Sequence, residues 1–369
     1  MPARRILLAT CAVAAALAAG CGEDDSDSGS EEAAKSKTEQ AGGADLAGVK
    51  SFLTDHTEAL TSQTAILKEK GQDYYDIAES ENFDYQAVLA NHREEVAGLL
   101  EDSKAAFRKA NPDYEEMEGI VAGVVRLAEY DVILDAGASG EEDPESAVPF
   151  DLKLPNGKTL EKPGNFFFLL ETSLFGTNPD FAAKGVKPDL DGDGKVAFGE
   201  GLPEANFYLA ASRDMDKYAN ELKTKAEEFE PTESDALSAL VIMTPTMSEY
   251  FEAWKNSRFV AGAKAEEQGF VAASRLQDIA DILSGLVLTY EGVEPVIRKS
   301  DPQQAKQTGE SLKQLHAFAA DLRDKEAAGK KFTAEEADTL GARAQDQAEA
   351  IAGQITQAAA KLDIKIVEG

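Results

Sequence analysis

An acidic twelve-residue stretch, residues 189–200, has the residue types and the spacing of a calcium-binding loop of the EF-hand kind. Calcium is a hard cation that takes roughly six to eight oxygen ligands, and a loop of this length offers oxygens from alternate positions. The expected ligands are three aspartates, a backbone carbonyl and a glutamate that binds through both oxygens, in the order Asp189, Asp191, Asp193, Lys195 and Glu200. The sequence therefore predicts a bound Ca²⁺, with a solvated acidic turn as the alternative.

Glycine and proline in and before this stretch indicate how the loop is built. Gly194 stands at the sixth loop position, where the chain turns sharply and a Cβ atom would be in the way. Pro188 directly precedes the loop and disfavours helical backbone at Lys187, so we do not expect a long helix to enter it. A second stretch with this pattern does not occur in the sequence. We therefore expect the ion to be a constitutive structural clip between two helical halves and not a sensor.

Hydrophobic residues at helical spacing predict that most of the chain forms amphipathic helices around this loop. Four helix starts carry capping signals, namely Asp84, Asn111-Pro112, Thr232 with Asp235, and Thr333 with Glu336. The predicted helices span residues 45–79, 84–109, 111–137, 166–175, 203–229, a segment from 232 that is kinked at Pro245, and then 270–299, 301–327 and 333–362.

These elements predict a mainly α protein made of two antiparallel helical bundles, with a small β-hairpin and the calcium loop between them. The hairpin is expected at residues 150–162, where apolar and polar residues alternate around a Pro-Asn-Gly turn. The predicted segments are an N-terminal bundle segment at 44–137, the hairpin, short helix and calcium loop at 138–202, and a C-terminal bundle segment at 203–369.

The first 43 residues have the composition of a targeting segment and a linker. A short basic start and an apolar run predict a signal peptide at residues 1–20, and residues 21–43 form an acidic linker without apolar periodicity. The residues Leu-Ala-Ala-Gly-Cys at 17–21 resemble the lipobox of bacterial lipoproteins, which implies that Cys21 is acylated. The expected location is then the extracytoplasmic face of the cell membrane, periplasmic or at the cell surface. An ordinary cleaved signal peptide is the alternative.

Charge and cysteine content limit the classes of partner. The formal net charge is −31, which argues against nucleic acid because phosphate binding requires clustered Lys and Arg. The sequence has two cysteines, Cys11 and Cys21. Cys11 lies in the predicted signal peptide and Cys21 is the predicted lipid acceptor. The mature chain is therefore expected to lack disulfides and to depend on its core, and on metal, for stability.

Several patches resemble the imelysin-like family, which includes the iron-uptake lipoproteins EfeO and EfeM. They are residues 114–118, 127–131, 134–135, 164–175 and 274–285. The stretch 164–175 is similar to that family's Gly-x-His-x-x-Glu helix. Phe168 stands where the family has its metal-binding His, and a phenyl ring cannot bind a metal ion. Glu171 stays in register with the family's Glu, so the usual His-Glu site is not expected in its usual form.

Carboxylates in these patches suggest a second cation site that uses oxygen ligands alone. Spacings of three and four residues place Glu115 with Glu118, and Asp131 with Asp135, on shared helix faces. Together with Glu171, they form a set that favours hard cations such as Ca²⁺, Mg²⁺ or ferric iron. Solvated helix faces are the alternative interpretation in a chain this acidic.

These observations leave three hypotheses about function. The first is a calcium-binding, lipid-anchored scaffold or binding protein that is not an enzyme. The second, implied by the resemblance, is the metal-capture component of an iron-uptake system, with a metal-uptake permease as partner. The third is an imelysin-type peptidase, which is less favoured because the sequence shows no Ser-His-Asp signature, phosphate loop or zinc-spaced cluster.

Overall fold

The computed structural model describes residues 43–367, which are mainly helical. The predicted signal peptide, Cys21 and, apart from Gly43, the linker lie outside these residues. In chain order the elements are α1 (Leu46–Ser80), α2 (Tyr85–Gly123), α3 (Ala128–Asp131), the π-helix η1 (Val132–Ala136), β1 (Leu152–Lys153), β2 (Thr159–Leu160), α4 (Phe166–Phe175), α5 (Ala205–Glu228), α6 (Glu233–Met243), the 3₁₀ turn η2 (Thr244–Thr246), α7 (Met247–Asn256), the 3₁₀ turn η3 (Gly262–Lys264), α8 (Arg275–Ser300), α9 (Pro302–Ala327) and α10 (Ala334–Lys361).

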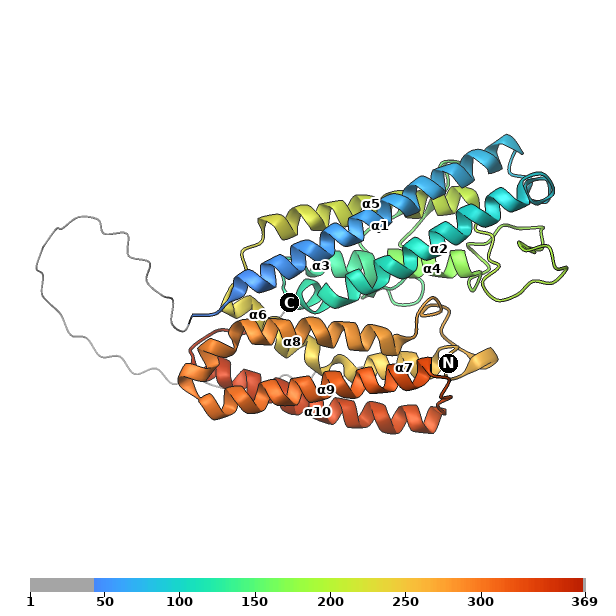
Figure 1. Cartoon of the computed structure of the whole chain (residues 1–369). Helices are drawn as coiled ribbons and strands as arrows, with labels where there is room; N and C mark the ends of the chain where they lie inside the picture. Colours follow the sequence, from blue (N-terminus) through green and yellow to red (C-terminus); the bar gives the residue numbers. More distant parts are fainter. Residues whose placement is uncertain (1–42, 368–369) are drawn as a thin grey trace, which may run out of the picture. The chain divides into compact units, whose positions relative to one another are not determined.

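The helices pack around two hydrophobic clusters. One cluster draws most of its side chains from α1, α2, α4 and α5, and the other draws most of its side chains from α6 to α10. Figure 1 shows how these helices are arranged. Helix α2 packs against α1 on one side and against α6 and α8 on the other, so it belongs to both groups. Helix α5 packs along α1, so the segment predicted as C-terminal gives its first helix to the first cluster. The predicted mainly α fold class is confirmed.

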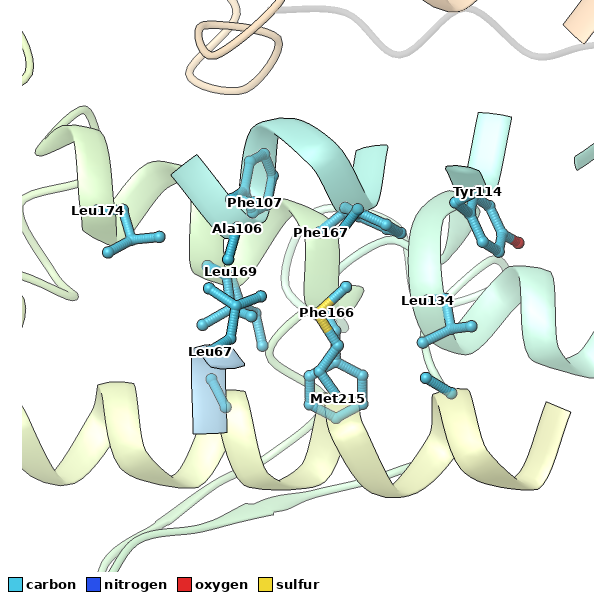
Figure 2. Close-up of a cluster of buried hydrophobic side chains, with 14 of the residues drawn as sticks. Leu67, Ala106, Phe107, Tyr114, Leu134, Phe166, Phe167, Leu169, Leu174 and Met215 are labelled. Atoms are coloured by element: carbon cyan, nitrogen blue, oxygen red, sulfur yellow. The ribbon is translucent and has the colours of Figure 1, made fainter. Parts of the chain in front are cut away.

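Helix α4 is short and almost entirely buried in the first cluster. Its N-terminus is capped by Asn165, whose side chain accepts a hydrogen bond from the backbone N–H of Phe168. Figure 2 shows Phe166, Phe167 and Leu169 among side chains of α1, α2 and α5. Because apolar residues surround this helix, any charged group on it must find a buried partner.

The predicted hairpin is confirmed as the antiparallel pair β1 and β2, with Leu152 opposite Leu160. Phe150, just before β1, stacks on Phe166 of α4 with 4.6 Å between the ring centroids. The stack attaches the hairpin to the helix that follows it.

Three of the four predicted helix starts are confirmed by their capping bonds. The carboxylate of Asp84 accepts from two backbone N–H groups at the start of α2. Thr232 with Asp235, and Thr333 with Glu336, form reciprocal capping boxes at α6 and α10.

The predicted helix break at Asn111-Pro112 is wrong, because α2 continues through both residues to Gly123. The Asn111 side chain donates to Asp278 of α8 at 2.9 Å and does not cap a helix start. Packing of α2 against α1 and α8 therefore outweighs the one backbone hydrogen bond that Pro112 removes. The non-helical backbone lies instead at His92, where φ is −130° and ψ is 19°.

Across residues 43–367, no helix combines the length and the hydropathy that a membrane span requires.

The contact between α2 and α8 yields a stability prediction. A Cβ atom added at Gly285 of α8 would lie 1.9 Å from the carbonyl oxygen of Glu116 on α2. Gly285→Ala should therefore force the helices apart and lower the free energy of unfolding by about 1–3 kcal/mol in urea titration. Gly98→Ala on α2 is the control: open space surrounds it, and it should stabilise the protein by about 0.5–1 kcal/mol. Equal effects of the two changes would contradict the close contact.

Candidate functional site: a carboxylate-lined cavity

Glu171 lies on the buried helix α4 and binds the backbone of the segment before α8. Its carboxylate accepts from the N–H groups of Phe270, Val271 and Ala272 at 2.6, 2.8 and 2.8 Å. Burial raises the pKa of Glu171 to about 7, although the three donors oppose the rise. The sequence predicted a helix from residue 270, which is wrong, because these N–H groups point at Glu171 and Ser274 caps a helix that begins at Arg275.

Three of the predicted carboxylates lie close together. Glu115, Glu118 and Asp135 each place an oxygen within 4.8 Å of the others. Glu118 is 3% exposed; its Oε1 accepts from the Tyr250 hydroxyl at 2.8 Å, and its Oε2 has no hydrogen-bond partner within the described residues. Asp131 stands apart from the three and accepts from the buried Tyr114 hydroxyl at 2.8 Å. The structure thus groups three of the five predicted residues, with Asp131 and Glu171 bonded elsewhere.

Arg275 is a buried cation among these carboxylates. Its Nη1 lies 3.3 Å from Glu115 and 3.1 Å from Asp278, and its guanidinium lies over the rings of Tyr250 and Phe270 at 4.4 and 4.3 Å. Although burial opposes its charge, Glu115 and Asp278 raise the pKa of Arg275 well above its ordinary range. Its Nε has no partner in the part of the chain that the structure describes.

Burial and mutual repulsion raise the pKa values of several carboxyl groups in this cluster. Burial and then the charge of Asp278 raise the pKa of Glu115 well above its ordinary value. Burial and then Glu118 raise the pKa of Asp131 well above its usual range and that of Asp135 to about 7. These groups hold protons more tightly than exposed carboxyl groups, chiefly because burial disfavours their charged forms and also because neighbouring carboxylates repel one another.

A cavity of about 580 Å³ opens beside the cluster. Glu118, Asp131, Asp135, Glu171 and Arg275 line it, as do residues of α4, α7 and the 266–270 segment. Phe168 also faces the cavity, at the position where the resemblance led us to look for a metal ligand. The sequence analysis did not identify Arg275, Asp278 and Tyr250 as part of this site. The spacing of Arg275 and Asp278 could have indicated it, because residues three apart place opposite charges on one helix face, here beside apolar neighbours.

The predicted calcium loop has part of the expected geometry. Asp189, Asp191 and Asp193 place oxygens within 4.8 Å of one another. Gly194 has φ +88°, and its N–H donates to Asp189 at 3.1 Å. Oδ1 of Asp189 is buried without a hydrogen-bond partner in the described residues, and Oδ2 lies 3.5 Å from the guanidinium of Arg93 on α2.

Glu200, the expected bidentate ligand, is bonded differently. Its carboxylate accepts from the N–H groups of Leu190, Asp191 and Ala197 at 2.8, 3.1 and 2.5 Å. It lies outside the group of three aspartates. The residues present fit a calcium ion in number and type, and Glu200 would have to exchange its backbone donors for the metal.

Contacts with α2 and with the segment after α7 are among those that attach this loop to the rest of the protein. The buried ammonium of Lys104 on α2 donates to the carbonyl of Gly199 at 2.5 Å. The guanidinium of Arg258, which follows α7, lies over the ring of Phe198. The loop therefore contacts α2 on one side and the segment after α7 on the other.

The fold and the cavity define a class: over residues 43–367 the protein is mainly helical, with a buried carboxylate cluster at a small-molecule-sized cavity. The family model described as imelysin, Peptidase_M75, matches residues 52–357, and the chain belongs to this family. A comparison with curated proteins gave no match. The matched residues include the whole cavity and the acidic loop.

The role of Arg275 gives a stability prediction. Removing its charge leaves the carboxylates of Glu115 and Asp278 buried without a cation, so Arg275→Gln should lower the free energy of unfolding by about 3–5 kcal/mol at pH 8. Arg298→Gln is the matched control on the same helix: its ion pair with Glu294 is exposed, so the change should cost at most about 0.5 kcal/mol. Similar losses in the two variants, measured by urea unfolding, would show that Arg275 is not the balancing charge.

Proposed function

We propose that this member of the imelysin family is an extracytoplasmic binding protein that captures a cation in the carboxylate-lined cavity. One observation carries the proposal: Glu118 is buried, its Oε2 has no partner among the described residues, and it lies beside Glu115 and Asp135. A buried carboxylate oxygen without a partner is costly, and a cation in the cavity would remove that cost.

The ligand set indicates which metal ions would fit. Carboxylate oxygens without a thiolate or imidazole favour hard cations, such as ferric iron, Mg²⁺ or Ca²⁺, over zinc or copper. Glu115, Glu118 and Asp135 would hold the ion. Phe168 offers no donor atom, and Glu171 is occupied by three N–H groups. We therefore assign Glu171 a positioning role for the segment before α8.

The family includes proteins of iron uptake and carries a peptidase name, and we propose the first kind of role. Capture of an ion for a membrane permease needs a binding cavity and no catalytic group, which agrees with the residues that line this one. The predicted lipid on Cys21 would keep the protein at the membrane where a permease operates. A peptidase remains the less favoured alternative, and hydrolysis of a broad peptide library would support it.

Metal titration tests the proposal. Calorimetry with ferric nitrilotriacetate should show saturable binding to the wild-type protein and at least tenfold weaker binding to Glu118→Gln, because the variant keeps the shape of the side chain and removes its charge. Glu94→Gln, an exposed position on the same helix α2, should bind like the wild type. No saturable heat in the wild type, or equal binding by all three proteins, would refute ferric iron capture at this site.

A second proposed function concerns the acidic loop, where three aspartates place oxygens within 4.8 Å of one another and Oδ1 of Asp189 has no hydrogen-bond partner among the described residues. We propose that Ca²⁺ binds there as a structural clip. The ion would tie together two neighbours of the loop: α2, which the loop contacts through Lys104, and the segment after α7, which it contacts through Arg258. Extracellular calcium, at millimolar concentration, would saturate even a weak site with a Kd on the order of 10⁻⁴ M.

Chelation tests the calcium clip. An ion that binds only the folded state at about ten times its Kd adds roughly 1.4 kcal/mol, so EGTA should lower the melting temperature by a few degrees. Asp191→Ala should melt at the lower temperature with or without chelator. Asp180→Ala, at an exposed aspartate outside the loop, should keep the wild-type response. A wild-type melt that chelator leaves unchanged would eliminate the clip.

A further inference from the structure

We propose that the cavity takes an organic cation, a linear di- or polyamine, held between carboxylates and aromatic rings. The inference rests on the proposed function, because both require the cavity to hold positive charge. It goes further by naming the chemical class of the ligand.

The size of the cavity is the first argument. Its volume of about 580 Å³ lies within the range of roughly 300–1,000 Å³ that is usual for small-molecule sites. A water molecule takes about 30 Å³ of liquid, so a metal ion coordinated by three carboxylates would leave most of this space to solvent. An extended amine fills more of it.

The second argument is the character of the walls. Five aromatic residues line the cavity: Phe107, Phe167, Phe168, Tyr250 and Phe270. Aromatic faces attract ammonium and guanidinium groups through their electron-rich centres, and they contribute little to binding a hydrated metal ion. Rings interleaved with carboxylates therefore favour a cation with an apolar body.

Arg275 shows this chemistry inside the protein. Its guanidinium lies over the rings of Tyr250 and Phe270 while carboxylates of Glu115 and Asp278 balance its charge. The same lining offers an acceptor to a second organic cation, because the Oε2 of Glu118 is buried and without a partner in the described part of the chain. An ammonium N–H would be a donor of the right kind for it.

The distribution of charge along the cavity points to a ligand with more than one amine. Carboxylates at its inner end, Glu118 and Asp131, are buried. Glu142, Glu249 and Glu266 also line it and are exposed, so they mark its mouth. Phe168 is half-buried and also faces the cavity. Acidic groups at both ends with rings among them match a chain that carries ammonium groups at its ends and methylenes in its middle.

Spermidine titration of the metal-free protein tests the inference by calorimetry at physiological salt. We expect one saturable site, and roughly tenfold weaker binding when Phe168→Leu removes a ring or Glu118→Gln removes a charge. Phe318→Leu is the control, because Phe318 is a half-buried ring under Arg343 and lies outside the cavity lining. It should bind like the wild type, and 1,5-pentanediol, which lacks charge, should not bind.

The variants locate the site, since an acidic surface also attracts polyamines non-specifically. Circular dichroism checks that each variant is folded. Equal spermidine binding by the wild type, Phe168→Leu and Glu118→Gln, or no binding at all, would overturn the inference. If ferric iron binds in a Glu118-dependent manner and spermidine does not, the metal-capture proposal stands and this inference fails. If neither binds, both fail.

Discussion

The buried guanidinium of Arg275 is the constraint on which the cavity depends. Carboxyl groups from α2, η1 and α8 converge at this place, where burial and mutual repulsion disfavour their charged forms and the guanidinium favours them. The guanidinium is planar and can contact two carboxylates while its faces rest on Tyr250 and Phe270. The guanidinium pairs with Glu115 and Asp278, whereas Oε2 of Glu118 has no hydrogen-bond partner in the part of the chain that the structure describes.

Helix α2 carries several of the polar side chains that form the carboxylate cluster and hold the acidic loop. It brings Glu115 and Glu118 to the carboxylate cluster and Tyr114 to Asp131, and closer to its N-terminus it supplies Lys104 to the acidic loop. Because α2 packs against both groups of helices, its register decides how the cluster faces α8. Glu171 complements α2, because from the buried helix α4 it holds the backbone ahead of α8 and so determines where the helix of Arg275 begins.

Short sequence patterns correctly predicted those features of the fold that depend on a few neighbouring residues. Capping boxes at Thr232 and Thr333 and the hairpin were readable, because each depends on a few neighbouring residues. Proline at 112 misled the prediction, since packing of α2 between two other helices overcame a local cost. For the candidate site, the sequence showed only the spacing of acidic residues, which placed Glu115 and Glu118 on one helix face. It did not show that Glu171 binds distant N–H groups, or that the buried ion pair includes Arg275, because both depend on contacts between residues far apart in the chain.

The π-helical turn η1 connects Asp131 to Asp135 and adds one residue per turn relative to an α-helix. The direction of the Asp135 side chain is therefore set by the number of residues in this turn more than by their identity. Substitutions among the apolar residues Val132, Ile133 and Leu134 alter packing and leave that number intact, whereas the loss of a single residue would restore ordinary helical geometry and swing Asp135 away from Glu118. Length variation at this short segment, among otherwise similar chains, would separate proteins that assemble the acidic cluster from proteins that do not.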